Sequence, residues 1–361
     1  MPTSTYIHIP FCKSKCKYCS FVSFNKLESI TAYIYSLLKE ISENYNNEPQ
    51  KTIYFGGGTP SLIPTQMFSK ILQKFKKTNN CEITIEVNPD DVTSEYLKEL
   101  LSIGFNRLSI GSQTFQDNIL KDIGRRHNSD DIIGAINLAK EAGFKNISID
   151  LIYGLPNQTI ELLDKDLGII SKLDIQHIST YGLKIEEESY WGKNTPNNLP
   201  DDDLQADMYV FINNFLEKYG FKRYEISNFA KEGFESRHNL NYWNNDEYYG
   251  FGVAAHGYVN SVRYANSNTL EEYISSPHIH EYGNFITPEE KLEEEIFLGF
   301  RKEEGINTSK IKEIFNIDFD KKYADVLNKY ADYIEKTPLG HKLTLEGVLI
   351  SNMILSEFLS D

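Results

Sequence analysis

Several features that mark whole classes of protein are scarce or absent in this sequence. No apolar run approaches the roughly 18 residues that a membrane-spanning helix needs. The N-terminal stretch MPTSTYIHIPF has no basic segment followed by an apolar one, so no signal peptide is expected. Basic residues are outnumbered, because 37 Lys and Arg stand against 52 Asp and Glu, for a net charge of −15. This balance speaks against broad electrostatic binding to nucleic acid or to an anionic membrane.

Cysteine is also rare, with four residues in a chain of 361. Three of them lie close together, which suits a reducing compartment better than a secreted, disulfide-stabilised scaffold. The hydrophobic fraction of 40% and the charged fraction of 25% are ordinary for a globular protein. The sequence therefore predicts an acidic, cytoplasmic, globular protein, built as one large domain with an appendage or as two domains.

Strand-like and helix-like segments alternate through the first two thirds of the chain. Amphipathic, helix-like patterns cover residues 27–41, 65–77, 94–104 and 129–143, and Ser129 is expected to cap the last of these. Six alternations imply parallel strands joined by right-handed crossovers, hence a barrel or a doubly wound sheet. The expected strands are Thr5–Ile9, Thr52–Phe55, Ile83–Val87, Arg107–Ile110, Asn146–Ile152 and His177–Leu183.

Glycines and polar residues collect where these strands end. Residues 56–60, Glu86, Gln113 and residues 154–156 lie at or just after the carboxyl ends of four strands, and Asp150 lies slightly earlier in its strand. In a parallel barrel that rim is where active sites are built. The first two thirds of the chain are therefore interpreted as the scaffold of one site.

The alternation ends near residue 230, which predicts three parts: residues 1–232 as the core, 233–285 as a connecting region and 286–361 as a helical C-terminal domain. The connecting region is rich in aromatic residues and Asn, as in a folded loop region. A winged-helix arrangement of the last part would make DNA binding an alternative. Residues 286–361 carry 10 Lys and Arg against 16 Asp and Glu, which argues against it.

Cys12, Cys16 and Cys19 form the pattern C-x3-C-x2-C, which places three thiols on one short loop. A structural zinc site needs four ligands, and no further Cys or His stands nearby at the usual spacing. An iron–sulfur cluster accepts three thiolates and leaves one iron open. The alternative is that buried thiols are grouped by chance. Cys81, far from the others, is expected to be an inert buried thiol.

The stretch CKSKCKYC after an N-terminal strand, followed by FGGGTPS, resembles the radical S-adenosylmethionine (SAM) enzymes. This resemblance implies a partial (β/α)6 TIM-like barrel with a small, mostly helical C-terminal domain. It also implies that Cys12, Cys16 and Cys19 hold a 4Fe–4S cluster and that SAM chelates the open iron. In that superfamily an electron from the cluster cleaves SAM to a 5′-deoxyadenosyl radical.

Six motifs narrow the resemblance, namely YIHIPFC, GGGTPS, IEVNP, LSIGSQTF, GRRHN and IDLIYGLPNQT. In this order and spacing they are similar to the oxygen-independent coproporphyrinogen III oxidase family. The strand-end glycines would let the backbone approach a ligand, and a buried carboxylate would need a cationic or hydroxyl partner. An arginine could pair with a carboxylate or lie in a surface ion pair, and the tyrosines also suit core packing. The resemblance implies SAM contacts from Tyr6, Tyr18, Gly57, Gly58, Thr59, Glu86, Gln113, Arg125 and Asp150.

Two departures point to one subgroup of that family. The true oxidases have a further cysteine two positions after the third, where this chain has Phe21, and a long N-terminal segment, where only 11 residues precede Cys12. Both departures match the HemW-type haem chaperones, which share an H-N-x-x-Y-W pattern. Its residues here are His238, Asn239, Tyr242 and Trp243, and the resemblance implies that they contact haem. A structural role, with His238 capping a turn, is the alternative.

The expected function is therefore a haem chaperone that carries a 4Fe–4S cluster and SAM and delivers haem to acceptors such as respiratory enzymes. The alternative is the oxidase reaction, a radical oxidative decarboxylation of coproporphyrinogen III to protoporphyrinogen IX. A third class, radical enzymes that modify tRNA, is disfavoured by the acidic net charge. No nucleic-acid or integral membrane partner is expected, and a homodimer is one state that the sequence allows.

Overall fold

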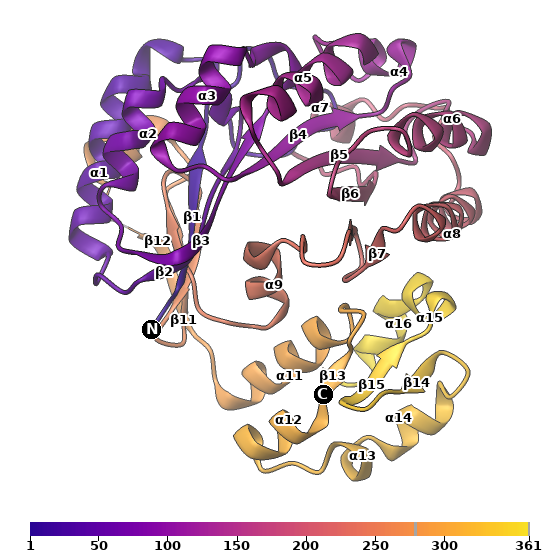
Figure 1. The fold of residues 1–361 in the computed structure, drawn as a ribbon. Helices are drawn as coiled ribbons and strands as arrows, with labels where there is room; N and C mark the ends of the chain where they lie inside the picture. Colours follow the sequence, from indigo (N-terminus) through magenta and orange to yellow (C-terminus); the bar gives the residue numbers. More distant parts are fainter. Residues whose placement is uncertain (278–279, 360–361) are drawn as a thin grey trace.

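The computed structural model describes residues 1–277 and 280–359. Figure 1 shows a large α/β body, a smaller C-terminal body in orange and yellow, and helix α9 (Arg237–Trp243) between them. One hydrophobic core lies in the large body and a second in the smaller one. Tyr209 of helix α8 (Asp202–Lys218) belongs to the second core, so the smaller body packs on that helix.

The large body is built on one nine-stranded sheet in the order β7-β8-β6-β5-β4-β3-β2-β1-β9. Strands β1 to β6 are parallel in chain order, as the sequence predicts, and β9 adds a parallel strand beside β1. Strand β8 is antiparallel to both β6 and β7. The bounds are β1 (Ser4–Ile9), β2 (Gln50–Gly57), β3 (Lys77–Val87), β4 (Arg107–Gln113), β5 (Ile147–Tyr153), β6 (His177–Gly182), β7 (Lys222–Arg223), β8 (Asn228–Ala230) and β9 (Tyr249–Phe251).

Helices connect the parallel strands and differ from the sequence prediction in two details. The helix expected over residues 65–77 ends at Leu72, because the chain from Lys77 joins strand β3. The cap of the helix that begins at Ser129 is Asn128, which forms a reciprocal pair of hydrogen bonds with Asp131, so the prediction of Ser129 was wrong. The helices are α1 (Ile30–Asn44), α2 (Thr65–Leu72), α3 (Ser94–Ile103), α4 (Asp117–Asp122), α5 (Ser129–Ala142), α6 (Ile160–Ile170) and α7 (Tyr190–Lys193).

The connecting region contains more regular structure than the sequence indicates. It forms a three-stranded antiparallel sheet from β10 (His256–Val259), β11 (Val262–Asn266) and β12 (His280–Phe285), with helix α10 (Leu270–Ser275) between the last two. The turn between β10 and β11 is Asn260–Ser261, and both residues have positive φ. That conformation matches the twist of a two-residue hairpin.

The C-terminal body is mostly helical, as predicted, but it also contains a three-stranded antiparallel sheet that the sequence did not reveal. Its strands are only two to four residues long, too short for a visible alternation of apolar residues. The winged-helix arrangement and the three domain boundaries stay predictions. The elements are α11 (Pro288–Gly299), β13 (Ile306–Asn307), α12 (Thr308–Phe315), α13 (Phe319–Lys322), α14 (Ala324–Lys329), β14 (Ile334–Lys336), β15 (Gly340–Leu343), α15 (Leu345–Leu349) and α16 (Ser351–Ser356).

Within the part of the chain that the structure describes, no helix has both the length and the apolar character required to cross a bilayer.

Candidate cofactor-binding site

A cavity of about 400 Å³, here called the rim pocket, lies at the carboxyl ends of the parallel strands. This is the edge at which the sequence placed the functional residues. With the exception of Tyr6, every residue predicted to hold a cluster or SAM lines it. These are Cys12, Cys16, Tyr18, Cys19, Gly57, Gly58, Thr59, Glu86, Gln113, Arg125 and Asp150.

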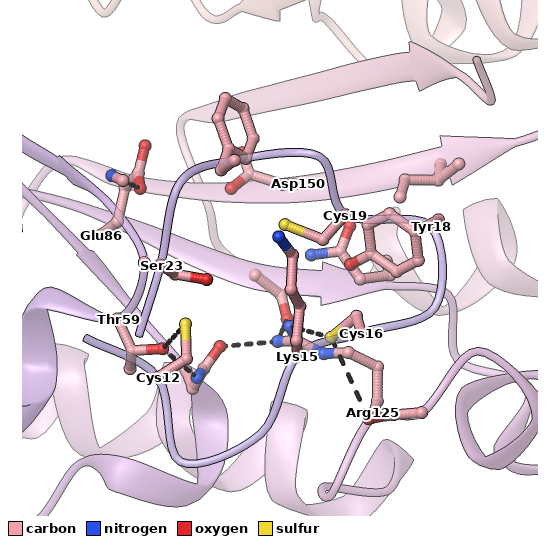
Figure 2. Close-up of a pocket in the computed structure, with 18 of the residues that line it drawn as sticks. Cys12, Lys15, Cys16, Tyr18, Cys19, Ser23, Thr59, Glu86, Arg125 and Asp150 are labelled. Atoms are coloured by element: carbon pink, nitrogen blue, oxygen red, sulfur yellow. Dashed lines mark hydrogen bonds between the residues drawn. The ribbon is translucent and has the colours of Figure 1, made fainter. Parts of the chain in front are cut away.

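Three of the wall residues are the clustered cysteines, which are free thiols and half-buried. Figure 2 shows their sulfur atoms and the side chain of Lys15 gathered in the same cavity. Among the described residues, no three His, Cys, Asp or Glu side chains are close enough to hold a single metal ion. The three sulfurs line one cavity, and three thiolates on a short loop can hold an iron–sulfur cluster.

The cysteine loop, residues 10–24, is fixed to the barrel along its length. The Cys12 amide donates to the Phe24 carbonyl over 3.1 Å, which joins the two ends of the loop. The Lys17 amide donates to the Ile123 carbonyl over 3.0 Å, which attaches the middle of the loop to the barrel. Lys13 forms an ion pair with the buried carboxylate of Asp91 at 2.6 Å. A loop held in this way presents its thiols in a defined arrangement before any ligand binds.

Arg125 connects the cysteine loop with two strand ends. Its Nη1 donates to Sγ of Cys16 over 3.7 Å, and its Nη2 donates to Oδ1 of Asn88 over 2.7 Å and to the Gly111 carbonyl over 2.6 Å. Its Nε is buried without a partner. Arg125 is therefore a half-buried part of the pocket wall, and among the residues that the structure describes it does not form the surface ion pair that the sequence left open.

The glycines after β2 leave no room for side chains. A Cβ on Gly57 would lie 2.5 Å from the His8 ring, and φ at Gly57 is +114°. A Cβ on Gly58 would lie 2.7 Å from the Phe11 carbonyl oxygen. The backbone can therefore approach a ligand closely at this edge, as the sequence predicted.

Two half-buried carboxylates, those of Glu86 and Asp150, also line the rim pocket. Glu86 accepts hydrogen bonds from the Tyr54 hydroxyl over 2.9 Å and from the Gly57 amide over 3.1 Å. Burial, and next the nearby Asp150 carboxylate, raise the pKa of Glu86 to about 7. Asp150 accepts from the Ser109 hydroxyl over 3.1 Å, and burial raises its pKa as well. Both groups would gain from a cationic ligand, which restores the charged form of each carboxylate.

Gln113 points into the rim pocket from a strained backbone, with φ of +67°. The next residues are held by the buried carboxylate of Asp166 in helix α6. It accepts from the Thr114 hydroxyl over 2.6 Å, the Phe115 amide over 3.1 Å and the Gln116 side chain over 2.8 Å. These contacts offset the backbone strain and hold Gln113 in the pocket.

The sequence did not single out several of these supporting residues. Asn88 also donates to Thr59 over 3.2 Å, so it links three parts of the pocket wall. Asn88 belongs to the motif IEVNP. A polar residue directly after a buried strand is the sequence signal that could have identified it. Asp166 lies in a helix, at no strand end, and its role appears only in the folded chain. Cys81 is buried and burial raises its pKa to about 12, as expected for an inert thiol.

The residues of the H-N-x-x-Y-W pattern do not line the rim pocket, because helix α9 lies on the other side of Tyr54. His238 is 1% exposed. Its Nδ1 is 2.8 Å from the Thr52 hydroxyl and its Nε2 is 2.8 Å from the Tyr242 hydroxyl. Burial, and next the nearby Arg107, lower the pKa of His238 to about 3. The imidazole is therefore neutral and has both ring nitrogens hydrogen-bonded.

The chain is similar to proteins of known families. Residues 6–168 match the model of the radical SAM superfamily, and residues 286–350 match that of the HemN C-terminal domain. The chain is 36% identical to the heme chaperone HemW of Lactococcus lactis, over 100% of this chain and 98% of that protein. It is also 36% identical to HemW of Bacillus subtilis, over 99% of each chain.

Among solved structures, coproporphyrinogen III oxidase (HemN) from Escherichia coli has a TM-score of 0.87. The match covers 99% of this chain and 90% of that one, at 23% sequence identity. At this identity the likeness concerns the fold. It confirms the predicted α/β radical SAM fold with a parallel sheet and a small C-terminal domain.

Proposed function

Because this chain belongs to the HemW family of haem chaperones, we propose that it binds haem and delivers it to acceptor proteins, with respiratory enzymes as the expected class. The observation that carries the proposal is the 36% identity to two HemW proteins over essentially the whole chain. Phe21 supports it, because this position is cysteine in the true oxidases and is here a side chain that is 64% exposed.

Membership of the radical SAM superfamily implies a 4Fe–4S cluster and SAM. When bound, such a cluster supplies one electron for the reductive cleavage of SAM. We propose that Cys12, Cys16 and Cys19 hold the cluster, since these free thiols surround one cavity. Their number leaves one iron open for SAM.

The remaining pocket residues divide the binding of SAM between them. The half-buried carboxylates of Glu86 and Asp150 would attract its cationic groups and accept from its hydroxyls. Gly57 and Gly58 let the backbone come close, and Gln113 offers an amide from the neighbouring strand end. Thr59, Tyr18 and Arg125 complete the wall beside the cysteine loop. Tyr6 lies behind Tyr54, at a ring centroid distance of 6.2 Å, and would act through that residue.

Haem contact by His238, Asn239, Tyr242 and Trp243 stays a prediction. Because both nitrogens of His238 are hydrogen-bonded and the ring is buried, iron ligation by His238 requires helix α9 to move. The haem-chaperone proposal does not depend on these four residues. Homodimer formation and a cytoplasmic location are further proposals, which light scattering and cell fractionation would test.

The proposal is tested by an anaerobic haem titration of the reconstituted protein, followed through the Soret absorbance. We expect saturation near one haem per chain, with retention of haem on a desalting column. His238→Ala in parallel locates the ligand: an altered Soret band places ligation at His238, and an unaltered one places it elsewhere. Absence of any saturable binding by the native chain would refute the proposal.

The oxidase reaction is the competing function, favoured by the structural likeness to HemN. It predicts that the reconstituted protein, given a reductant, SAM and coproporphyrinogen III under anaerobic conditions, forms protoporphyrinogen IX. We expect no turnover above the rate without enzyme. Sustained turnover by the native chain would replace the chaperone proposal.

A further inference from the structure

Glu86 is held in the rim pocket by two hydrogen bonds of different origin. The Gly57 amide donates to one carboxylate oxygen over 3.1 Å. This bond comes from the backbone of the glycine turn, residues 56–58. The Tyr54 hydroxyl donates to the other oxygen over 2.9 Å, and this bond depends on the orientation of one side chain. The direction in which Glu86 faces the pocket is therefore set in part by whatever fixes Tyr54.

The Tyr54 ring is fixed between two other rings. The His238 imidazole stacks on it at a centroid distance of 5.0 Å and an interplanar angle of 23°. On strand β1, Tyr6 lies at 6.2 Å and 26°. Tyr6 is in turn hydrogen-bonded to His8 at 3.0 Å. Tyr54 thus has little freedom to rotate away from Glu86.

His238 is itself fixed on several sides. Thr52 and Tyr242 hold its two ring nitrogens, and its amide donates to the buried carboxylate of Glu82 over 3.1 Å. The other end of helix α9 is also anchored, because Lys302 of the C-terminal body donates to Oδ1 of Asn244 over 2.9 Å. Figure 1 shows α9 placed between the two bodies. These contacts fix the position of the His238 ring beside Tyr54.

We propose that Tyr54 and His238 are positioning residues of the SAM site. The Tyr54 hydroxyl orients the Glu86 carboxylate toward the pocket, and the His238 ring, stacked on Tyr54, holds that tyrosine in place. This inference rests on the proposed role of Glu86 as a SAM contact. It gives the histidine of the H-N-x-x-Y-W pattern a role in cofactor binding that does not involve haem.

SAM binding should depend on pH, because the pKa of Glu86 is near neutrality. Burial and Asp150 raise that pKa, whereas the hydrogen bonds from Tyr54 and Gly57 and the charge of Arg107 lower it. Loss of the Tyr54 hydroxyl therefore raises the pKa further, so more of Glu86 is protonated at pH 7 and attracts a cation less. The charged and titratable groups near Glu86 are Asp150, Arg107, Tyr6, Tyr54, Tyr181 and Tyr242.

The test measures SAM affinity of the reconstituted full-length protein between pH 6 and 8.5. The variants are Tyr54→Phe, which removes only the hydroxyl, and His238→Phe, which keeps a flat aromatic ring but removes both ring nitrogens. His177→Phe is the matched control, because His177 is equally buried and also bonds two hydroxyls, those of Ser148 and Tyr224. Its hydrogen bonds do not involve Glu86. Iron content and far-ultraviolet circular dichroism confirm that each variant is folded and loaded.

We expect Tyr54→Phe to weaken SAM binding severalfold at pH 7, because Glu86 loses the donor that fixes its direction and lowers its pKa. The midpoint of the rise in affinity with pH should move upward. His238→Phe should act in the same direction with a smaller change, and His177→Phe should leave affinity and midpoint unchanged. If His238→Phe does not fold, Thr52→Val removes one His238 contact with little change of shape and serves in its place.

Glu86→Gln separates the two levels of the proposal. If it retains native affinity and pH dependence, the role of Glu86 as a SAM contact fails, and the inference fails with it. If it loses both while Tyr54→Phe and His238→Phe bind as the native protein does, Glu86 stands and the positioning role is refuted. Equal losses in His177→Phe and His238→Phe, without a shifted midpoint, would also refute it, because they would reflect general loosening of the barrel.

Discussion

The guanidinium of Arg125 ties the cysteine loop to the barrel wall, with its Nη1 3.7 Å from Sγ of Cys16. The same group donates to Asn88 and to the Gly111 carbonyl. A planar, forked cation reaches these three acceptors from two nitrogens, a geometry that the single nitrogen of a lysine does not reproduce. The loop that would hold the cluster and the strands that would hold SAM therefore share one side chain.

Replacement of Arg125 is expected to affect both cofactors together. In Arg125→Met the Asn88 oxygen and the Gly111 carbonyl lose a charged donor, so we expect SAM affinity to fall at least about tenfold. Arg125→Lys should recover only part of this loss, since it restores the charge without the fork. Iron content and equilibrium SAM binding are the measurements, with the exposed Lys121→Met as control. Native SAM affinity in Arg125→Met would contradict the shared role.

Substitution of single cysteines should distinguish cluster ligands from a cysteine that does not bind the cluster. Cys16→Ala should retain clearly less iron and sulfide after anaerobic reconstitution, because two thiolates hold a cubane cluster poorly. Cys81→Ala should reconstitute like the native chain, since Cys81 is buried away from the rim pocket. The measurements are iron counting and the absorbance near 400 nm that is typical of 4Fe–4S clusters. A full, stable cluster in Cys16→Ala would remove that residue from the ligand set.

Adding a side chain at Gly58 is expected to cause a steric clash. In Gly58→Ala the new methyl group would lie 2.7 Å from the Phe11 carbonyl oxygen, so the glycine turn or the cysteine loop must shift. We expect loss of SAM binding and a free energy of unfolding lower by about 2 kcal/mol.

The matched control for that substitution is Gly134→Ala in helix α5, where nothing lies within 4 Å of the new Cβ. Alanine is the better helix former, so this variant should be more stable by about 0.5–1 kcal/mol and should bind SAM normally. Thermal unfolding and SAM titration follow both variants. Unchanged SAM binding in Gly58→Ala would show that the turn has more room than the structure indicates.

Asp166 lies outside the rim pocket, and we expect it to control the conformation of Gln113 inside the pocket. Asp166→Asn turns one acceptor oxygen into a donor, which faces either the Thr114 hydroxyl, at Oδ2, or the Phe115 amide and the Gln116 side chain, at Oδ1. We expect a loss of about 3 kcal/mol in stability. SAM affinity should also fall, because Gln113 is no longer held in its strained conformation. Asp164→Asn, on the exposed side of the same helix, is the control. Chemical denaturation measures the first effect, and equal midpoints for the two variants would contradict it.

Much of this fold could be predicted because the parallel strands are buried. Strands such as Ile83–Val87 are short and largely apolar, and four of the six predicted strands end at polar or glycine residues that mark the rim. Residues that contact a ligand directly from a strand end, such as Glu86 and Gln113, are visible for the same reason. The three thiols are visible because their spacing is local.

What could not be predicted depends on contacts between distant parts of the chain. Asp166 supports Gln113 across 53 positions of sequence, and no local pattern distinguishes it from a solvated acid in a helix. The burial of His238 depends on Thr52 and Glu82, more than 150 residues away. The two- to four-residue strands of the C-terminal body are too short for any periodicity.

The central claim is that this chain carries haem and gives it up to another protein. The most direct measurement loads the reconstituted protein with haem under anaerobic conditions, removes free haem, and adds the haem-free form of a bacterial respiratory haem enzyme. We predict that the Soret band changes to that of the acceptor and that acceptor activity appears, in proportion to the haem supplied. If the chain holds no haem after free haem is removed, or holds it and never yields it to the acceptor, the account is contradicted.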